Sequence, residues 1–172
     1  MKNIIKNKNS KGFTLVETLI YVLLFAILSI FLINTLLVML RSYTEVRVND
    51  DILDAAHTSM ERMTREIRGS ASSTITSITS TSSSLLLNTT DASGTAITEQ
   101  FDATSSALEF RYNGTVSGNL TGSHVSVTSL IFRGITTTAG YAIRIEMIIQ
   151  SLRSPTNKSM LFTDTVALRG SY

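Results

Sequence analysis

The pattern of apolar and polar positions changes twice along the chain and so divides it into three sections. The first section is a run of apolar residues that no charged residue interrupts. The 23 positions of 18–40 carry no charged residue, and 16 of them are Leu, Ile, Val or Phe. A helix rises ~1.5 Å per residue, so this run spans ~35 Å, enough to cross a hydrocarbon core of ~30 Å. At roughly −0.5 kcal/mol for each large apolar residue, the run favours insertion by about −8 kcal/mol. This section therefore predicts a single membrane-spanning helix.

The second section is amphipathic and follows without a break. Positions 41–68 contain neither Gly nor Pro. Apolar residues recur there at spacings of three and four, which places them on one face of a helix: Ile52, Ala56, Met60, Met63 and Ile67. Gly69 fits a C-cap, and Arg65 and Arg68 suit the negative end of the helix dipole. The simplest prediction is one continuous helix that begins near Phe13 and ends at Arg68.

A polar stretch separates this helix from the third section. Positions 70–84 hold twelve Ser or Thr in fifteen residues. This composition indicates a loop or a weak edge strand. A glycosylated stalk is the alternative, but such stalks usually contain Pro, and this stretch has none.

From Leu85 onward the apolar period is two, which predicts strands. The expected strands cover 85–87, 108–112, 125–132 with a bulge, 141–149 and 160–169. Turns are expected at 91–94, 113–118, 134–140 and 154–157. Residues 141–149 alternate most cleanly, and Phe162, Val166 and Leu168 form the apolar face of the last strand. An antiparallel sheet with one apolar face can pack on the amphipathic half of the helix, so the predicted fold class is α+β.

An acidic residue at the start of the apolar run changes the interpretation. Glu17 opposes insertion by about 2 to 3 kcal/mol if it lies deep and unpaired, which the apolar run outweighs. A secretory signal would have a shorter apolar region and a small-residue cleavage site, and positions 39–42 offer none. A plain signal anchor explains the basic flank and the apolar run, but it does not explain Glu17. An acid at the mouth of a membrane helix needs a partner.

Residues 11–17 read KGFTLVE and resemble the processing site of type IV pilins and type II secretion pseudopilins. In that family a membrane peptidase cuts after the glycine and methylates the new amino terminus. The resemblance implies that Gly12 ends the leader, that Phe13 becomes the N-methylated first residue, and that Glu17 remains as an assembly charge. The pilin fold also has one long helix packed on an antiparallel sheet, which agrees with the α+β prediction.

The resemblance has a looser second part and two departures. Positions 63–68 and 162–169 are similar to stretches of minor pseudopilins of the J class and of related minor type IV pilins. Many major pilins carry a disulfide near the carboxyl end and a proline within the membrane helix. This chain has no cysteine, and its single proline is Pro155.

Charge and composition limit the remaining functions. Lys2, Lys6, Lys8 and Lys11 precede the expected cut with no acid among them, which places the amino terminus in the cytoplasm and the rest outside. Their removal leaves 11 basic residues against 13 acidic ones, a formal net charge of −2, so the mature chain is not basic enough to indicate nucleic acid. The residue pattern shows no catalytic site, metal site or cofactor motif, and no small-molecule substrate is expected.

The expected organisation has five parts. These are a basic leader (1–12), the membrane and assembly half of the helix (13–40), its amphipathic half (41–69), the Ser/Thr-rich loop (70–84) and an antiparallel sheet domain (85–172). The resemblance implies a minor pilin or pseudopilin that acts in a filament or its initiating tip. Its implied partners are a prepilin peptidase, other pilin subunits and the cytoplasmic membrane. The alternative is a membrane-anchored binding module, an adhesin or DNA-uptake receptor, but no basic and aromatic stripe is present to bind single-stranded DNA.

Overall fold

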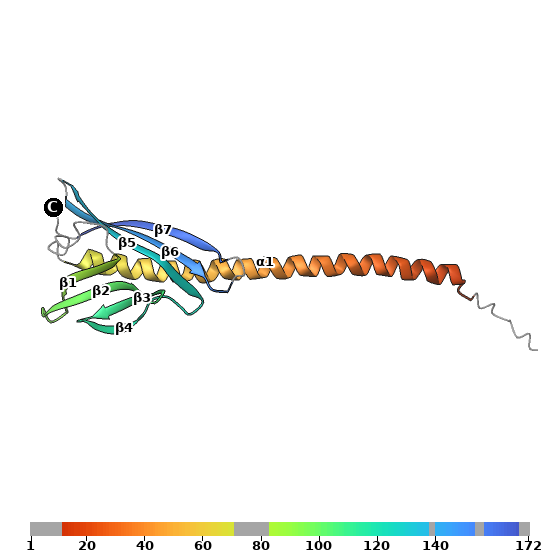
Figure 1. Ribbon diagram of the computed structural model, residues 1–172, viewed down its shortest axis with the longest axis horizontal. Coiled ribbons are helices and arrows are strands. Elements are labelled where there is room, and N and C mark those ends of the chain that lie inside the picture. Colours follow the sequence, from red (N-terminus) through yellow and green to blue (C-terminus); the bar gives the residue numbers. More distant parts are fainter. Residues whose placement is uncertain (1–11, 71–82, 138–139, 154–156, 169–172) are drawn as a thin grey trace, which may run out of the picture. The chain divides into compact units, whose positions relative to one another are not determined.

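A computed structural model describes residues 12–70, 83–137, 140–153 and 157–168 (Figure 1). The chain divides into two compact units, Met1–Tyr43 and Thr44–Tyr172. One helix, α1 (Leu15–Gly69), runs through both. The prediction of a single helix is confirmed, with a start two residues later than Phe13 and an end one residue beyond Arg68.

In the first unit α1 presents its apolar side chains to the outside all round. The large apolar residues from Phe13 to Tyr43 are exposed, and none of the most apolar window of the helix is buried within the protein. By length and composition this part of α1 can cross a membrane. A surface of this size and apolarity is unfavourable in water, and a bilayer covers it. The helix therefore fits a single-pass membrane anchor.

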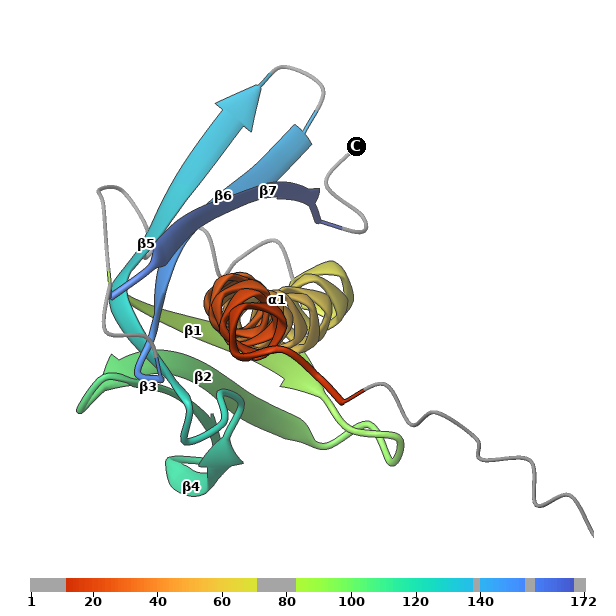
Figure 2. The same ribbon diagram turned by 90° about the vertical axis from the view of Figure 1, so that its right-hand side faces the viewer.

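In the second unit the strands form two antiparallel sheets. The first contains β1 (Ser84–Thr90), β2 (Ala96–Thr104), β3 (Ala107–Tyr112) and β4 (Thr115–Asn119), paired in that order. The second contains β5 (Val125–Thr137), β6 (Gly140–Ser151) and β7 (Ser159–Ala167), also paired in order. The two sheets lie on different sides of the second half of α1 (Figure 2). The α+β, pilin-like layout is confirmed, with the strands divided between two sheets instead of forming one.

The core joins α1 to both sheets. The predicted helix face is buried at Ile52, Ala56, Met63 and Ile67, and Met60 packs at its edge. In β6 the alternation is confirmed, because Ile143, Ile145, Met147 and Ile149 are all fully buried. The last strand points Val166 and Leu168 inward, with Phe162 half-buried against the same core.

Two predicted irregularities are confirmed. The register of β5 against β6 shifts between Val127 and Ser129, which is the expected bulge. The turn after β1 is built on Asp91, whose Oδ1 accepts from the Ser93 and Thr95 N–H groups at 2.8 and 2.9 Å. Hydrogen bonds from the Ser93 hydroxyl and from these two amides hold the pKa of Asp91 below its ordinary value. Gly94 in the same turn has φ +83°, a conformation that favours glycine.

One strand was missed from the sequence, and two expected turns are shorter than predicted. Strand β2 was missed, because its inward positions Ile97 and Phe101 flank the buried Glu99, which breaks the apolar alternation. The expected turn at 113–118 is shorter than predicted, since β4 begins at Thr115. Every residue of that strand is exposed, and Val116 is its one large apolar residue, so the sequence shows no alternation there. The expected turn at 134–140 is shorter too, because β5 and β6 stay paired as far as Thr137 and Gly140. The backbone hydrogen bonds between β5 and β6 continue past the last residues whose side chains reach the apolar core.

Some predictions lie wholly or partly outside the described residues. These are the leader apart from Gly12, positions 71–82 of the Ser/Thr-rich stretch, positions 154–156 of the last turn and the chain after Leu168. Of the Ser/Thr-rich stretch, Ser84 is the first residue of β1. The last strand ends at Ala167, two residues before the predicted end.

Candidate processing and assembly site

The start of α1 is fixed by Thr14. Its Oγ1 accepts a hydrogen bond from the Glu17 N–H at 3.3 Å, and its carbonyl accepts from the Thr18 N–H at 3.2 Å. This is N-cap geometry, in which a side-chain oxygen satisfies an amide that the helix leaves free. Gly12 and Phe13 therefore precede the helix and belong to no helix or strand.

Glycine at position 12 is not required by this chain. A Cβ built on Gly12 meets no atom within 4 Å, and its φ lies outside the range that favours glycine. Neither packing nor backbone strain within the protein therefore explains why a glycine stands here.

Glu17 lies one turn into the helix and is half-exposed. Its Oε1 accepts a hydrogen bond from the Tyr21 hydroxyl at 3.2 Å. The Tyr21 ring meets the Phe13 ring edge to face, with centroids 6.1 Å apart and an interplanar angle of 69°. Phe13, Glu17 and Tyr21 follow at intervals of four, so they share one side of the chain. Among the described residues, Glu17 forms no ion pair with a basic side chain.

The sequence-predicted residues Gly12, Phe13 and Glu17 thus lie within two turns of one another, and two further residues complete the group. Thr14 and Tyr21 were missed by the sequence reasoning, although both had a signal. Thr14 and Glu17 have the spacing of a capping box, and Tyr21 follows Glu17 at the i, i+4 interval.

Comparison with known families adds a direct observation at these residues. Positions 7–33 match the family model described as the prokaryotic N-terminal methylation motif. The chain carries the signature motif of the type IV pilin and pseudopilin family. No curated protein and no solved structure matches the chain. The motif implies processing by a prepilin peptidase and assembly with other pilins.

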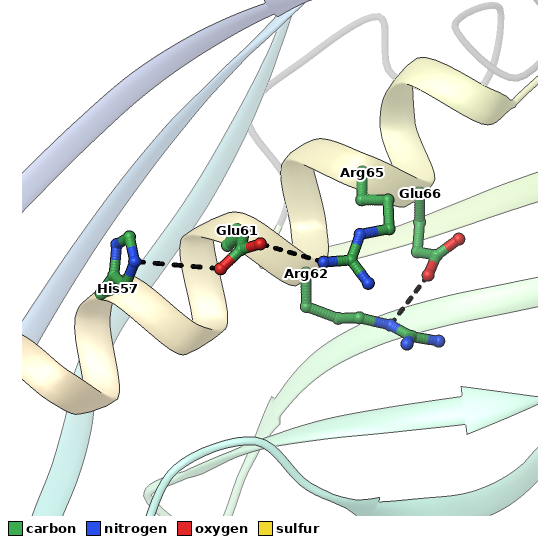
Figure 3. Close-up of polar contacts among 5 residues, drawn as sticks. All are labelled: His57, Glu61, Arg62, Arg65 and Glu66. Carbon is green, nitrogen blue, oxygen red and sulfur yellow. Dashed lines mark hydrogen bonds and ion pairs between the residues drawn. The ribbon is translucent and has the colours of Figure 1, made fainter.

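The second unit has its own polar groups on α1 (Figure 3). On the exposed side, Glu61 lies 3.8 Å from His57 and 3.0 Å from Arg65. These are i, i+4 pairs on a solvated face, and each contributes little to stability. In the described part of the chain, no three His, Cys, Asp or Glu side chains are grouped closely enough to hold a metal ion.

A less exposed group lies where α1 meets the first sheet. Arg62 Nε is 2.8 Å from Glu66 Oε1, and the Arg62 guanidinium lies over the Phe110 ring of β3. Glu99 of β2 is 6% exposed. Burial, the charge of Glu66 and a hydrogen bond with Glu66 together raise the pKa of Glu99 to about 6, and the charge of Arg62 opposes them. Two carboxyl groups and one guanidinium thus form a titratable contact between helix and sheet.

Proposed function

We propose that this chain is a structural subunit of a type IV pilus or type II secretion pseudopilus. In this proposal the first half of α1 holds the precursor in the membrane, and a prepilin peptidase cuts it between Gly12 and Phe13. The same enzyme methylates the new amino terminus at Phe13, and the helix then carries the subunit into a filament. The methylation motif carries the proposal, because it coincides with the start of an exposed apolar helix.

The surroundings of Gly12 support the assignment of the cleavage point. A residue that the fold does not need but the motif contains is expected to serve an outside partner. A peptidase that approaches the backbone closely is such a partner, since glycine offers no side chain to obstruct it. The bond after Gly12 also joins two exposed residues outside the helix, ahead of the Thr14 cap, where a protease can reach it.

The position of Glu17 supports a role in assembly. Cleavage would create an ammonium group at Phe13, one helical turn from the Glu17 carboxylate. The hydrogen bond from Tyr21 orients this carboxylate but leaves its charge unneutralised. An unpaired charge near membrane depth is unfavourable, and pairing with an ammonium removes much of that penalty. Pairing with the amino terminus of a neighbouring subunit would also fix the axial register of one helix against the next.

We further propose that the chain is a minor subunit of the J class, which acts at the tip where the filament is initiated. This assignment rests on the similarity of positions 63–68 and 162–169 to minor pseudopilins. These two stretches meet in the fold, where Thr64 Oγ1 donates to Asp164 Oδ2 at 3.1 Å. The leader lysines support an orientation with the amino terminus in the cytoplasm and the second unit on the outer side of the cytoplasmic membrane.

Mass spectrometry of the membrane-extracted chain, co-expressed with a prepilin peptidase, tests the proposal. The expected product begins with N-methylated Phe13 and appears only when the peptidase is active. Isolation of the filament fraction should then recover the processed form and exclude the precursor. A mature form that begins at another residue, or a processed form that never enters filaments, would contradict the proposed function. The second result would favour a membrane-held binding module.

A further inference from the structure

The carbonyl group of Gly12, which belongs to the bond of the proposed cut, lies outside the helical hydrogen bonds of α1. In a helix each N–H donates to the carbonyl four residues earlier, so a longer α1 would bind the Gly12 carbonyl through the Val16 N–H. Among the described residues this bond is absent, and the first backbone bond of the helix runs from the Thr18 N–H to the Thr14 carbonyl at 3.2 Å. Less than one further turn of helix would therefore engage the scissile carbonyl.

The Thr14 hydroxyl opposes this extension. A helix that grows toward the amino end must pair the Glu17 N–H with the Phe13 carbonyl before it reaches Gly12. The Thr14 Oγ1 already accepts from that N–H at 3.3 Å, so the hydroxyl and the Phe13 carbonyl compete for one donor. While the hydroxyl holds it, α1 begins at Leu15 and the two residues of the cut stay outside the helix.

The Phe13 side chain gives a second, independent observation of the same kind. Helical side chains lean toward the amino end of a helix, so a helical Phe13 would direct its ring away from Tyr21. The two rings instead meet edge to face, with centroids 6.1 Å apart. This contact favours the same non-helical residue 13 that the Thr14 cap favours.

A free scissile carbonyl helps a peptidase in two ways. Hydrolysis adds water across the Gly12–Phe13 bond and leaves a carboxylate on Gly12 and an ammonium on Phe13. Negative charge develops on the carbonyl oxygen during this step, and the enzyme must direct its own donors there. A carbonyl bound within a helix must first be released by local unwinding, which is slow to supply the open form. Near membrane depth unwinding is costlier still, because little water is present to replace the lost bond.

We propose that Thr14 is a positioning residue for the cleavage step. Its hydroxyl fixes the start of α1 after the cut, so that the Gly12–Phe13 bond reaches the peptidase already unwound. The inference rests on the proposed function, since it concerns the same cut. It assigns Thr14 a role that acts through the conformation of the substrate and needs no contact between the hydroxyl and the enzyme.

Cleavage kinetics of the full-length precursor, in membranes that contain the peptidase, test this role. Thr14→Val keeps the branched shape but removes the acceptor, and it should slow cleavage several-fold. Thr14→Ser keeps the hydroxyl and should be cut within about twofold of the parent rate, because Ser and Thr are both good N-caps. Thr18→Val is the matched control: it removes a hydroxyl that donates to the Leu15 carbonyl at 2.8 Å and leaves the cap intact. It should be cut at the parent rate.

Thr14→Pro separates a change in the helix start from a direct contact with the enzyme. Proline has no hydroxyl, but it disfavours the helical conformation of the residue before it, so Phe13 stays outside α1. We expect Thr14→Pro to be cut several-fold faster than Thr14→Val. A Thr14→Pro precursor as slow as Thr14→Val would mean that the peptidase needs the hydroxyl itself, and a Thr14→Val precursor cut like the parent would mean that the cap is irrelevant. Either result overturns the proposal.

The parent chain separates this inference from the proposed function. Rates are compared per membrane-inserted precursor, and melting of the second, outer unit (Thr44–Tyr172) should not change, because Thr14 lies in the first unit. A parent precursor that is not cut after Gly12 would reject the proposed function itself. A parent that is cut there, together with equally fast cleavage of Thr14→Val, would reject only the role of Thr14.

Discussion

The guanidinium carbon of Arg62 lies 4.8 Å from the centroid of the Phe110 ring, while Nε of the same side chain is 2.8 Å from Glu66. One arginine on α1 therefore contacts an aromatic ring of the first sheet and an acid of its own helix. The buried Glu99 of β2 interacts with both charged groups of this pair. The contact between α1 and the first sheet thus depends on protonation.

Stability of the outer unit should fall as pH rises through the pKa of Glu99. The folded-state pKa of about 6 exceeds the ordinary value of 4.5, so the folded state holds the proton more tightly. The resulting stabilisation is fully present below about pH 4.5 and is lost as pH rises through about 6, with a change of about 1 to 2 kcal/mol. Thermal melting of the detergent-solubilised chain at pH 4.5 and pH 7.5 measures it.

Glu99→Gln should abolish this part of the pH dependence, since the amide cannot ionise. Glu109→Gln is the matched control, because Glu109 lies on the next strand, paired with Arg111 at 3.0 Å. The control should keep the pH dependence. An unchanged slope in Glu99→Gln would mean that another group titrates in this window.

Ile145→Asp should unfold or severely destabilise the outer unit. Ile145 is fully buried at the centre of β6, and an unpaired carboxylate there lowers the free energy of unfolding by several kcal/mol. Total domain stability is only about 5 to 15 kcal/mol. Thr115→Asp introduces the same charge at an exposed strand position and should melt within a few degrees of the parent chain. Equal melting of both variants would show that Ile145 does not lie in the core.

Gly12→Val should leave the precursor uncut in the membrane. The valine side chain fits the free chain, because nothing in the protein approaches this position, so any effect arises at the peptidase. Gly122→Val is the control at another glycine with open space around it, and it should be processed normally. Immunoblotting for the size shift and intact-mass analysis measure the result. Normal cleavage of Gly12→Val would remove Gly12 from the cleavage site.

Glu17→Gln separates recognition by the peptidase from assembly. The amide keeps the shape and the acceptor oxygen for Tyr21 but removes the charge. We expect normal cleavage, together with a failure to co-purify with partner pilins or to initiate filaments. Failed cleavage would favour a recognition role, and normal cleavage with normal assembly would exclude both roles.

Tyr21→Phe gives the matched comparison for that experiment. It keeps the edge-to-face contact with Phe13 and removes only the hydroxyl that donates to Glu17. If the charge is what assembly needs, this variant should assemble far better than Glu17→Gln. Co-purification with partner pilins, measured for both variants side by side, gives the comparison.

Periodicity predicted the elements whose burial is regular. The helix and β6 were recognised because their apolar residues recur at one spacing, and all four inward residues of β6 from Ile143 to Ile149 are buried. Strand β2 was not recognised from the sequence, because the polar residue Glu99 occupies one of its inward positions and interrupts the apolar alternation. The division into two sheets was not predicted either, because a period of two shows which face is buried but not which strands pair.

The candidate site shows the same limit. Gly12, Phe13 and Glu17 followed from a motif that has fixed spacing in the sequence. The roles of Thr14 and Tyr21 depend on side-chain orientation at the start of α1, which the motif does not specify.

The contact between Thr64 and Asp164 has a consequence for solubility. Strand β7 pairs on one side only, with β6, so its other edge is open to pairing with foreign strands. Asp164 accepts from Thr64 with one oxygen and from the Thr165 amide with the other, at 3.1 and 2.8 Å. A negative charge and an occupied amide in the middle of this edge discourage strand-to-strand aggregation. The outer unit is thereby protected from aggregating with other copies of the chain through this edge.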